Sequence, residues 1–137
     1  MTKEEKELLL KDICARLPYG VKGLRSYSDD IVEIYDITPK CEINSNIGQG
    51  TFTELCFTNL DCCSIGDFKP YLRPMSSMTE EERAEYFLLK HRDNDRDDNI
   101  ILIDEASTLI DWLNAHHFDY RGLIEKGLAL EAPEGMY

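Results

Sequence analysis

Residues 31–37 read IVEIYDI, and residues 51–58 read TFTELCFT. Both runs are rich in β-branched and aromatic residues, which is typical of β-strands. Turn-forming residues from Asn44 to Asn46, followed by two nearby glycines, separate the two runs. Strand-like sequence extends from about residue 20 to about residue 65, which predicts a small, mostly antiparallel sheet of roughly three to five strands.

A helical pattern precedes the predicted sheet, and another follows it. Residues 3–17 are amphipathic, with Thr2 as the expected N-cap and Pro18 as the stop. After the sheet, residues 68–75 contain two prolines and large apolar side chains, so we expect a connector that crosses the edge of the core. A helix is then predicted over residues 78 to about 90.

The expected start of that helix is a capping box formed by Ser77 and Glu80. Apolar and aromatic residues at helical spacing predict a further helix over residues 105–116. A last helix is predicted over residues 119–130, with Asp119 as its cap.

Together these patterns predict an α+β fold. We expect an N-terminal helix, the small sheet, and two or three C-terminal helices in a single domain of residues 1–137. The strand-rich part spans about residues 20–65, and the helical part spans about residues 76–130.

The chain of 137 residues is acidic, with 15 Lys and Arg against 27 Asp and Glu and a net charge of −12. This charge opposes attraction to phosphates, so direct binding to a nucleic-acid duplex is not expected. No apolar run reaches the roughly 20 residues that span a bilayer, and the first residues lack a secretory signal pattern. We therefore expect a cytoplasmic protein without a membrane partner.

The five cysteines are Cys14, Cys41, Cys56, Cys62 and Cys63. Their odd number and the absence of C-x-x-C spacing argue against a disulfide framework and a structural zinc site. For the adjacent pair Cys62 and Cys63 we expect one side chain to pack inward and its neighbour to face outward. Either thiol paired with a histidine would define a small cysteine-dependent enzyme, but no established catalytic motif is present, and we expect no enzymatic activity.

An acidic segment at residues 93–104 has the spacing of a calcium-binding loop. Acids at positions 1, 3, 5 and 12 lie between two predicted helices, as in an EF-hand. Asp98 stands where the loop normally needs glycine, and the last acid is shorter than the expected glutamate. A solvated acidic loop is the alternative, and no other cofactor is expected. If calcium binds, its ligands are Asp93, Asp95, Asp97 and Asp104.

Aromatic residues near the ends of predicted elements are candidates for contact with a partner. Most aromatic side chains lie in cores because they bury large areas. Those exposed in a patch become candidate binding hot spots. The candidates are Trp112, Phe118, Tyr120 and Tyr71.

Three blocks of sequence resemble segments shared by uncharacterised small proteins of Bacteroides-type gut bacteria, their phages and mobile elements. The blocks are KELLLKDICARLPYGV at residues 6–21, KPYLRPMSSMTEEE at residues 69–82 and WLNAHHFDYRGLIEKGLALEAPEGMY at residues 112–137. The resemblance implies a bacterial or phage cytoplasmic context and carries no activity, cofactor or active site.

Small acidic proteins of such elements are often accessory factors, including inhibitors of host defence. We therefore expect a non-enzymatic accessory protein that binds a host or phage protein, or a nucleotide-like signal. A calcium-binding module and a cysteine-dependent enzyme are the alternatives. The sequence leaves the oligomeric state open.

Overall fold

The computed structural model describes residues 1–44, 48–90 and 103–137, with side chains for residues 1–39, 53–90 and 107–137. Short 3₁₀ helices connect some of the main elements, at Leu17–Tyr19, Ile65–Asp67 and Met75–Ser77. The main elements, in chain order, are α1 (Lys3–Arg16), β1 (Val21–Arg25), β2 (Ile31–Asn44), β3 (Gly48–Phe57), β4 (Cys62–Ser64), β5 (Phe68–Leu72), α2 (Glu80–Lys90), α3 (Ile103–Ala115) and β6 (Leu130–Glu131).

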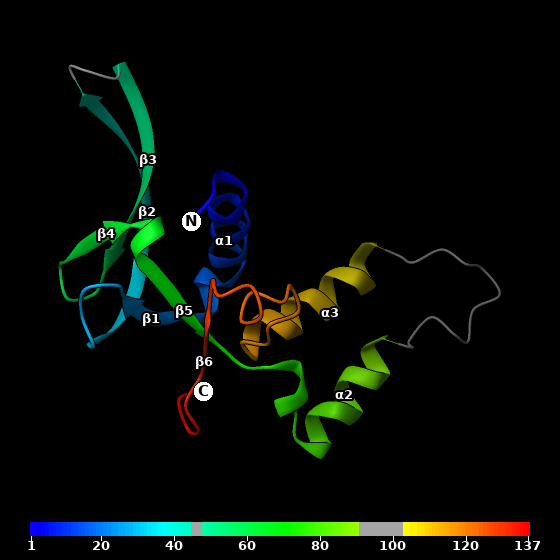
Figure 1. Ribbon diagram of the computed structural model, residues 1–137. Helices are drawn as coiled ribbons and strands as arrows, with labels where there is room; N and C mark the ends of the chain where they lie inside the picture. The colour runs from blue at the N-terminus through cyan, green and yellow to red at the C-terminus, as the bar shows by residue number, and fades with distance from the viewer. Residues whose placement is uncertain (45–47, 91–102) are drawn as a thin grey trace.

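The strands form one six-stranded sheet in the order β4-β3-β2-β1-β5-β6. Every pairing is antiparallel except that of β5 with β6, so the fold is α+β with a mixed sheet. The ribbon of β2 and β3 extends well beyond its neighbours (Figure 1). Among the described residues, no helix combines the length and apolar character needed to cross a membrane.

Helix α1 confirms the prediction made from its end signals. Thr2 and Glu5 form a reciprocal capping box, in which each side chain accepts a hydrogen bond from the other residue's backbone amide. Pro18 lies in the short 3₁₀ helix that follows. The helix lies against one face of the sheet (Figure 1).

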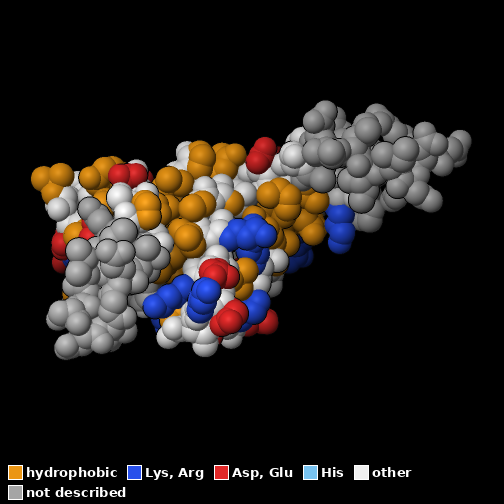
Figure 2. All heavy atoms as spheres, turned by 90° about the horizontal axis from the view of Figure 1, so that it is seen from above, with side chains coloured by type: hydrophobic (Ala, Val, Ile, Leu, Met, Phe, Trp, Pro, Cys, Tyr) orange, Lys and Arg blue, Asp and Glu red, His pale blue; other side chains and the backbone are white. Residues whose placement is uncertain are grey.

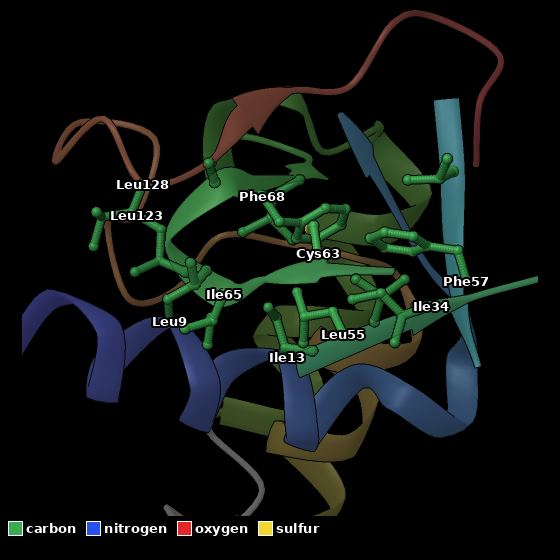
Figure 3. Packing of buried hydrophobic residues seen from close by; sticks show 14 residues of the cluster. Leu9, Ile13, Ile34, Leu55, Phe57, Cys63, Ile65, Phe68, Leu123 and Leu128 are labelled. Carbon is green, nitrogen blue, oxygen red and sulfur yellow. The ribbon is translucent and has the colours of Figure 1, made fainter. Parts of the chain in front are cut away.

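The main core lies between α1 and this face. Leu9 and Ile13 of α1 are fully buried, together with Leu55 and Phe57 of β3. Figure 3 shows the two helix side chains pointing toward the sheet residues. Phe57 and Phe68 pack with their ring centroids 5.6 Å apart, and this apolar burial is the main source of stability.

An ionic cluster, which we call the α1 clamp, joins α1 to the C-terminal part of the chain. The fully buried Asp12 accepts hydrogen bonds from Arg16 at 2.9 and 3.1 Å and from Arg121 at 2.9 Å. Arg16 also donates to the backbone carbonyl of Phe118 at 2.6 Å. The carboxylate of Asp12 and the guanidinium of Arg16 are both removed from water. Each therefore depends on its hydrogen-bond partners to remain stable inside the protein.

Two strands were missed, so the sheet exceeds the predicted three to five strands. Residues 68–75, predicted to be a connector, contain β5. The amide of Ser26 donates to the carbonyl of Asp67, so these two residues form a hydrogen-bonded pair. Hydrogen-bonded and non-hydrogen-bonded pairs alternate along the ladder, and Gly23 with Pro70, three pairs further along, is therefore a non-hydrogen-bonded pair. The proline nitrogen therefore points away from β1, and the missing N–H costs the ladder no hydrogen bond.

The predicted last helix over residues 119–130 is wrong, because this segment forms turns followed by β6. Gly122 and Gly127 have φ values of 71° and 74°, which are incompatible with a right-handed helix. The carboxylate of Asp119 accepts hydrogen bonds from the amides of Leu123 and Ile124 and so folds the loop upon itself. In the described part of the chain, two α-helices, α2 and α3, therefore lie between β5 and β6.

The start of α2 also differs from the prediction. Its capping box is formed by Thr79 and Glu82, two residues after the predicted pair of Ser77 and Glu80. Helices α2 and α3 extend away from the sheet (Figure 1). A second apolar cluster of Met78, Leu113 and Phe118 lies where these helices join the body.

Candidate functional site

A groove of about 700 Å³ opens between the segment before α2 and the loop that follows α3. We call it the helical groove. About half of its lining residues are apolar or aromatic. We call Met75, Tyr86 and Leu113 its floor, and Glu125 with Glu131 its rim. The lining residues are Pro74, Met75, Ser76, Tyr86, Leu113, Asp119, Tyr120, Gly122, Ile124, Glu125 and Glu131.

Tyr120 forms a fixed wall of the helical groove. Its hydroxyl donates a hydrogen bond to the side-chain oxygen of Asn114 at 2.9 Å. The guanidinium groups of Arg16 and Arg121 lie 5.2 and 4.8 Å from the centre of its ring. These contacts with the α1 clamp fix the position of the ring.

The loop that carries the other wall is shaped by Asp119. Both carboxylate oxygens are used, at 2.8 Å to the amide of Leu123 and 3.0 Å to that of Ile124. Gly122, which lies between Asp119 and these two residues in the sequence, adopts the left-handed conformation that the turn requires. Asp119 is therefore a structural acid, although it lines the groove.

Glu125 and Glu131 supply the outward-facing charge of the groove. Both are exposed, and neither forms an ion pair within the described part of the chain. Elsewhere acidic and basic side chains are intermixed, as Figure 2 shows near the middle of the face seen from above. No Lys or Arg is among the described residues that line the groove, and the guanidinium groups of Arg16 and Arg121 lie against the ring of Tyr120.

A second hollow, of about 540 Å³, shares Pro74 and Glu131 with the helical groove. Arg73 is the only Lys or Arg among the described residues that line the two hollows. It donates to both carboxylate oxygens of Glu82, at 2.7 and 2.8 Å, and lies 4.3 Å from the ring centre of Phe118. The hydrogen bonds from Arg73 lower the pKa of Glu82 to about 2. This cation is therefore already engaged.

His117 lies close to the second hollow and is buried. Its ring stacks on Tyr137, with the ring centroids 3.6 Å apart, and Tyr137 lines that hollow. Burial, helped by the positive charges of Arg16 and Arg73, lowers the pKa of His117 to about 4. The imidazole is thus neutral at physiological pH.

The structure brings together three of the four aromatic residues predicted to contact a partner. Trp112 is half-buried, donates to the carboxylate of Glu85 at 2.9 Å, and stacks on Phe118 at 5.7 Å. Phe118 is fully buried, and Tyr120 lines the helical groove. Tyr71 lies apart from them on β5, where its carbonyl accepts a hydrogen bond from Tyr137.

The other residues of the groove were not among the predicted partner contacts. Met75 precedes α2 and Tyr86 lies within it, whereas Ile124 and Glu125 come from the segment predicted to be helical and Glu131 directly follows that segment. No local motif joins these positions, because the groove forms where segments about forty residues apart converge. The nearest signal was the aromatic residue Tyr120.

The predicted calcium ligands cannot be placed. Asp93, Asp95 and Asp97 lie outside the described residues, and so does the side chain of Asp104, whose backbone belongs to α3. In the described part of the chain, no three His, Cys, Asp or Glu side chains are grouped to hold a metal ion. The calcium hypothesis stays a prediction.

The adjacent cysteines confirm the predicted alternation, since Cys63 is buried in the core and Cys62 is exposed. Burial raises the pKa of Cys63 to about 12. Desolvation and the nearby carboxylate of Glu54 raise the pKa of Cys62. Both thiols are therefore protonated at neutral pH, which does not suit a catalytic nucleophile.

Comparison of the chain with protein-family profiles, curated proteins and solved structures found no match. Function is therefore inferred from the residues of the groove. Its apolar floor, fixed aromatic wall and exposed carboxylates can bind a complementary surface.

Proposed function

We propose that the protein is a non-enzymatic accessory protein that binds a protein partner in the helical groove. The partner presents a basic segment with one large apolar side chain. The apolar side chain contacts the floor formed by Met75, Tyr86 and Leu113, and the basic residues face Glu125 and Glu131.

The observation that carries the proposal is the combination of an apolar floor with an unbalanced acidic rim. Interfaces gain most of their affinity from a few apolar or aromatic anchors and gain specificity from charge complementarity. The volume of about 700 Å³ accommodates a large side chain together with its flanking backbone. A rim without a described cation favours Lys and Arg on the partner.

The same charge pattern argues against the alternative of a nucleotide-like signal in this groove. Phosphate oxygens are bound by Arg, Lys or clustered backbone amides. Among the described residues lining the two hollows, Arg73 is the only such side chain, and Glu82 occupies it. A protein partner is therefore the better fit.

The sequence context agrees with an accessory role. All lining residues of the helical groove except Tyr86 fall in residues 69–82 and 112–137, two of the blocks that resemble small proteins of Bacteroides-type bacteria, phages and mobile elements. We extend the proposal to a bacterial cytoplasmic protein that inhibits a host defence factor by direct contact.

Binding is tested with labelled peptides that carry Leu, Phe or Trp flanked by Lys and Arg, measured by fluorescence anisotropy. Matched peptides with Asp and Glu in the flanks serve as the ligand control. We expect binding of the basic peptides that weakens with added salt, because the rim charges are solvent-exposed.

The protein variants separate groove binding from general attraction to an acidic surface. Glu125→Lys with Glu131→Lys should abolish binding of the basic peptides. Glu4→Lys with Asp29→Lys makes the same charge change at exposed sites away from the groove and should retain it. Equal loss in both double variants, or binding of acidic peptides, would show that the groove is not the site.

The role in host defence is tested by the plating of phage on a bacterium that carries a defence system. Expression of the wild-type protein should raise the number of plaques, and the double variant at Glu125 and Glu131 should not. If both proteins raise the number of plaques equally, the inhibition does not depend on binding in the helical groove.

A further inference from the structure

Cys56 on β3 and Cys62 on β4 face each other directly across the β3–β4 hairpin. The amide of Phe57 donates to the carbonyl of Asp61 at 2.9 Å, so residues 57 and 61 form a hydrogen-bonded pair. Hydrogen-bonded and non-hydrogen-bonded pairs alternate along an antiparallel ladder, and Cys56 with Cys62 is therefore a non-hydrogen-bonded pair. In such pairs the Cα atoms lie about 4.5 Å apart, within the range that a disulfide spans.

Both thiols lie on the face of the sheet opposite the core. Their neighbours Leu55 and Cys63 are buried, and alternate strand residues point to opposite faces. Cys62 is exposed and Cys56 is partly exposed, so a small oxidant reaches the pair from solvent.

The turn between the two strands holds them in this register. The amide of Leu60 donates to the carbonyl of Phe57 at 3.0 Å, and Leu60 has a φ of 69°, as in a three-residue hairpin turn. Asp61 forms an ion pair with Arg25, and the hydroxyl of Tyr27 donates to the carbonyl of Cys62 at 3.3 Å. These contacts fasten β4 to the end of β1, and no rearrangement of the backbone is needed to bring the thiols together.

We propose that Cys56 and Cys62 form an intramolecular disulfide when the protein meets a peroxide. Hydrogen peroxide transfers one oxygen to the sulfur of Cys62, giving a sulfenic acid and water. The sulfur of Cys56 then attacks that of Cys62, the sulfur–oxygen bond breaks, and the hydroxyl leaves as water with the proton of Cys56. Two thiols and one peroxide thus yield one disulfide and two waters.

Desolvation of the Cys62 thiol and the nearby carboxylate of Glu54 together make the first step slow. The carboxylate of Glu54 lies 3.9 Å from the sulfur of Cys56, and after desolvation it is a main cause of the raised pKa of Cys62. Peroxide reacts with the thiolate, which is scarce at neutral pH when the pKa is raised. The pair therefore remains reduced until the oxidant accumulates.

The disulfide is detected by non-reducing mass spectrometry after treatment with hydrogen peroxide. Free thiols are first blocked at acidic pH, and a protease that cleaves before aspartate then cuts at Asp61, between the two cysteines. We expect the fragments on either side of this cut to remain joined, with the loss of two hydrogen atoms, and to separate on reduction.

Single variants assign the link. The joined fragments should disappear in Cys56→Ser and in Cys62→Ser, and should persist in Cys41→Ser, the control on the same fragment as Cys56. Persistence in Cys62→Ser would assign the link to Cys63 and overturn the proposal, as would fragments that never join in the wild type. Glu54→Gln should form the link several-fold faster at neutral pH, and an unchanged rate would remove Glu54 from this role.

Discussion

Lowering the pH from about 7.5 to about 5 should destabilise the folded protein by about 2 kcal/mol through one side chain, His117. This histidine is only 8% exposed. Its pKa is about 4 in the folded protein, against 6.5 for an ordinary histidine. Burial is the main cause, and the neighbouring positive charges of Arg16 and Arg73 add to it.

The direction follows from which state binds the proton first. The pKa of His117 is lower in the folded state, so the unfolded chain takes up the proton at higher pH. Stability is fully present above about pH 6.5 and is lost as the pH falls toward 4. The full shift corresponds to about 3 kcal/mol, of which about 2 kcal/mol is lost by about pH 5. Glu82 has a pKa of about 2, so its protonation lowers the stability only below about pH 4.5 and does not contribute to this loss.

The free energy of unfolding is measured by urea titration at a series of pH values. Circular dichroism is preferable to fluorescence, because it follows the unfolding of the whole chain. The fluorescence of Trp112 depends on the ring of His116 stacked against it, with the ring centroids 4.2 Å apart. In His117→Asn the loss should disappear, since Asn does not titrate and tolerates the φ of 61° at this position. His116→Asn is the matched control and should keep the loss. An equal loss in wild type and His117→Asn would refute the reasoning.

Three further substitutions test the packing, each by urea unfolding at neutral pH. Gly23→Ala should cost about 3 kcal/mol, because a Cβ atom would lie 2.3 Å from the backbone carbonyl oxygen of Lys69; a cost below about 1 kcal/mol would show that the strands separate freely. Asp12→Ala should cost about 3 to 5 kcal/mol, because Arg16 remains buried without its carboxylate; a neutral result would contradict the α1 clamp. Thr79→Ala should cost about 1 kcal/mol through the lost N-cap of α2, and an unchanged midpoint would argue against that cap.

The elements predicted correctly are those with local signals at both ends. Helix α1 has a capping residue, a regular apolar stripe and a proline stop. The sequences of the two long strands have β-branched residues on either side of turn-forming residue types. In each case the information lies within a few residues of the element itself.

The errors have two causes, a long-range strand pairing in one case and the conformation of two glycines in the other. Pro70 argues against a strand, yet its nitrogen faces the side of β5 away from β1. Residues 119–130 have a helical apolar pattern, yet two glycines in left-handed conformations break it. The helical groove depends on the convergence of these same regions, and only the aromatic residue Tyr120 pointed to it in the sequence.

The α1 clamp has a consequence for synthesis of the chain on the ribosome. Arg16 and the carbonyl that it binds are 102 positions apart, and Asp12 and Arg121 are 109 positions apart. Helix α1 is made first, but its charged pair cannot be enclosed until residue 121 has emerged. The ionic cluster therefore forms late in synthesis, although the strands that cover Leu9 and Ile13 emerge earlier and can already pack against the helix.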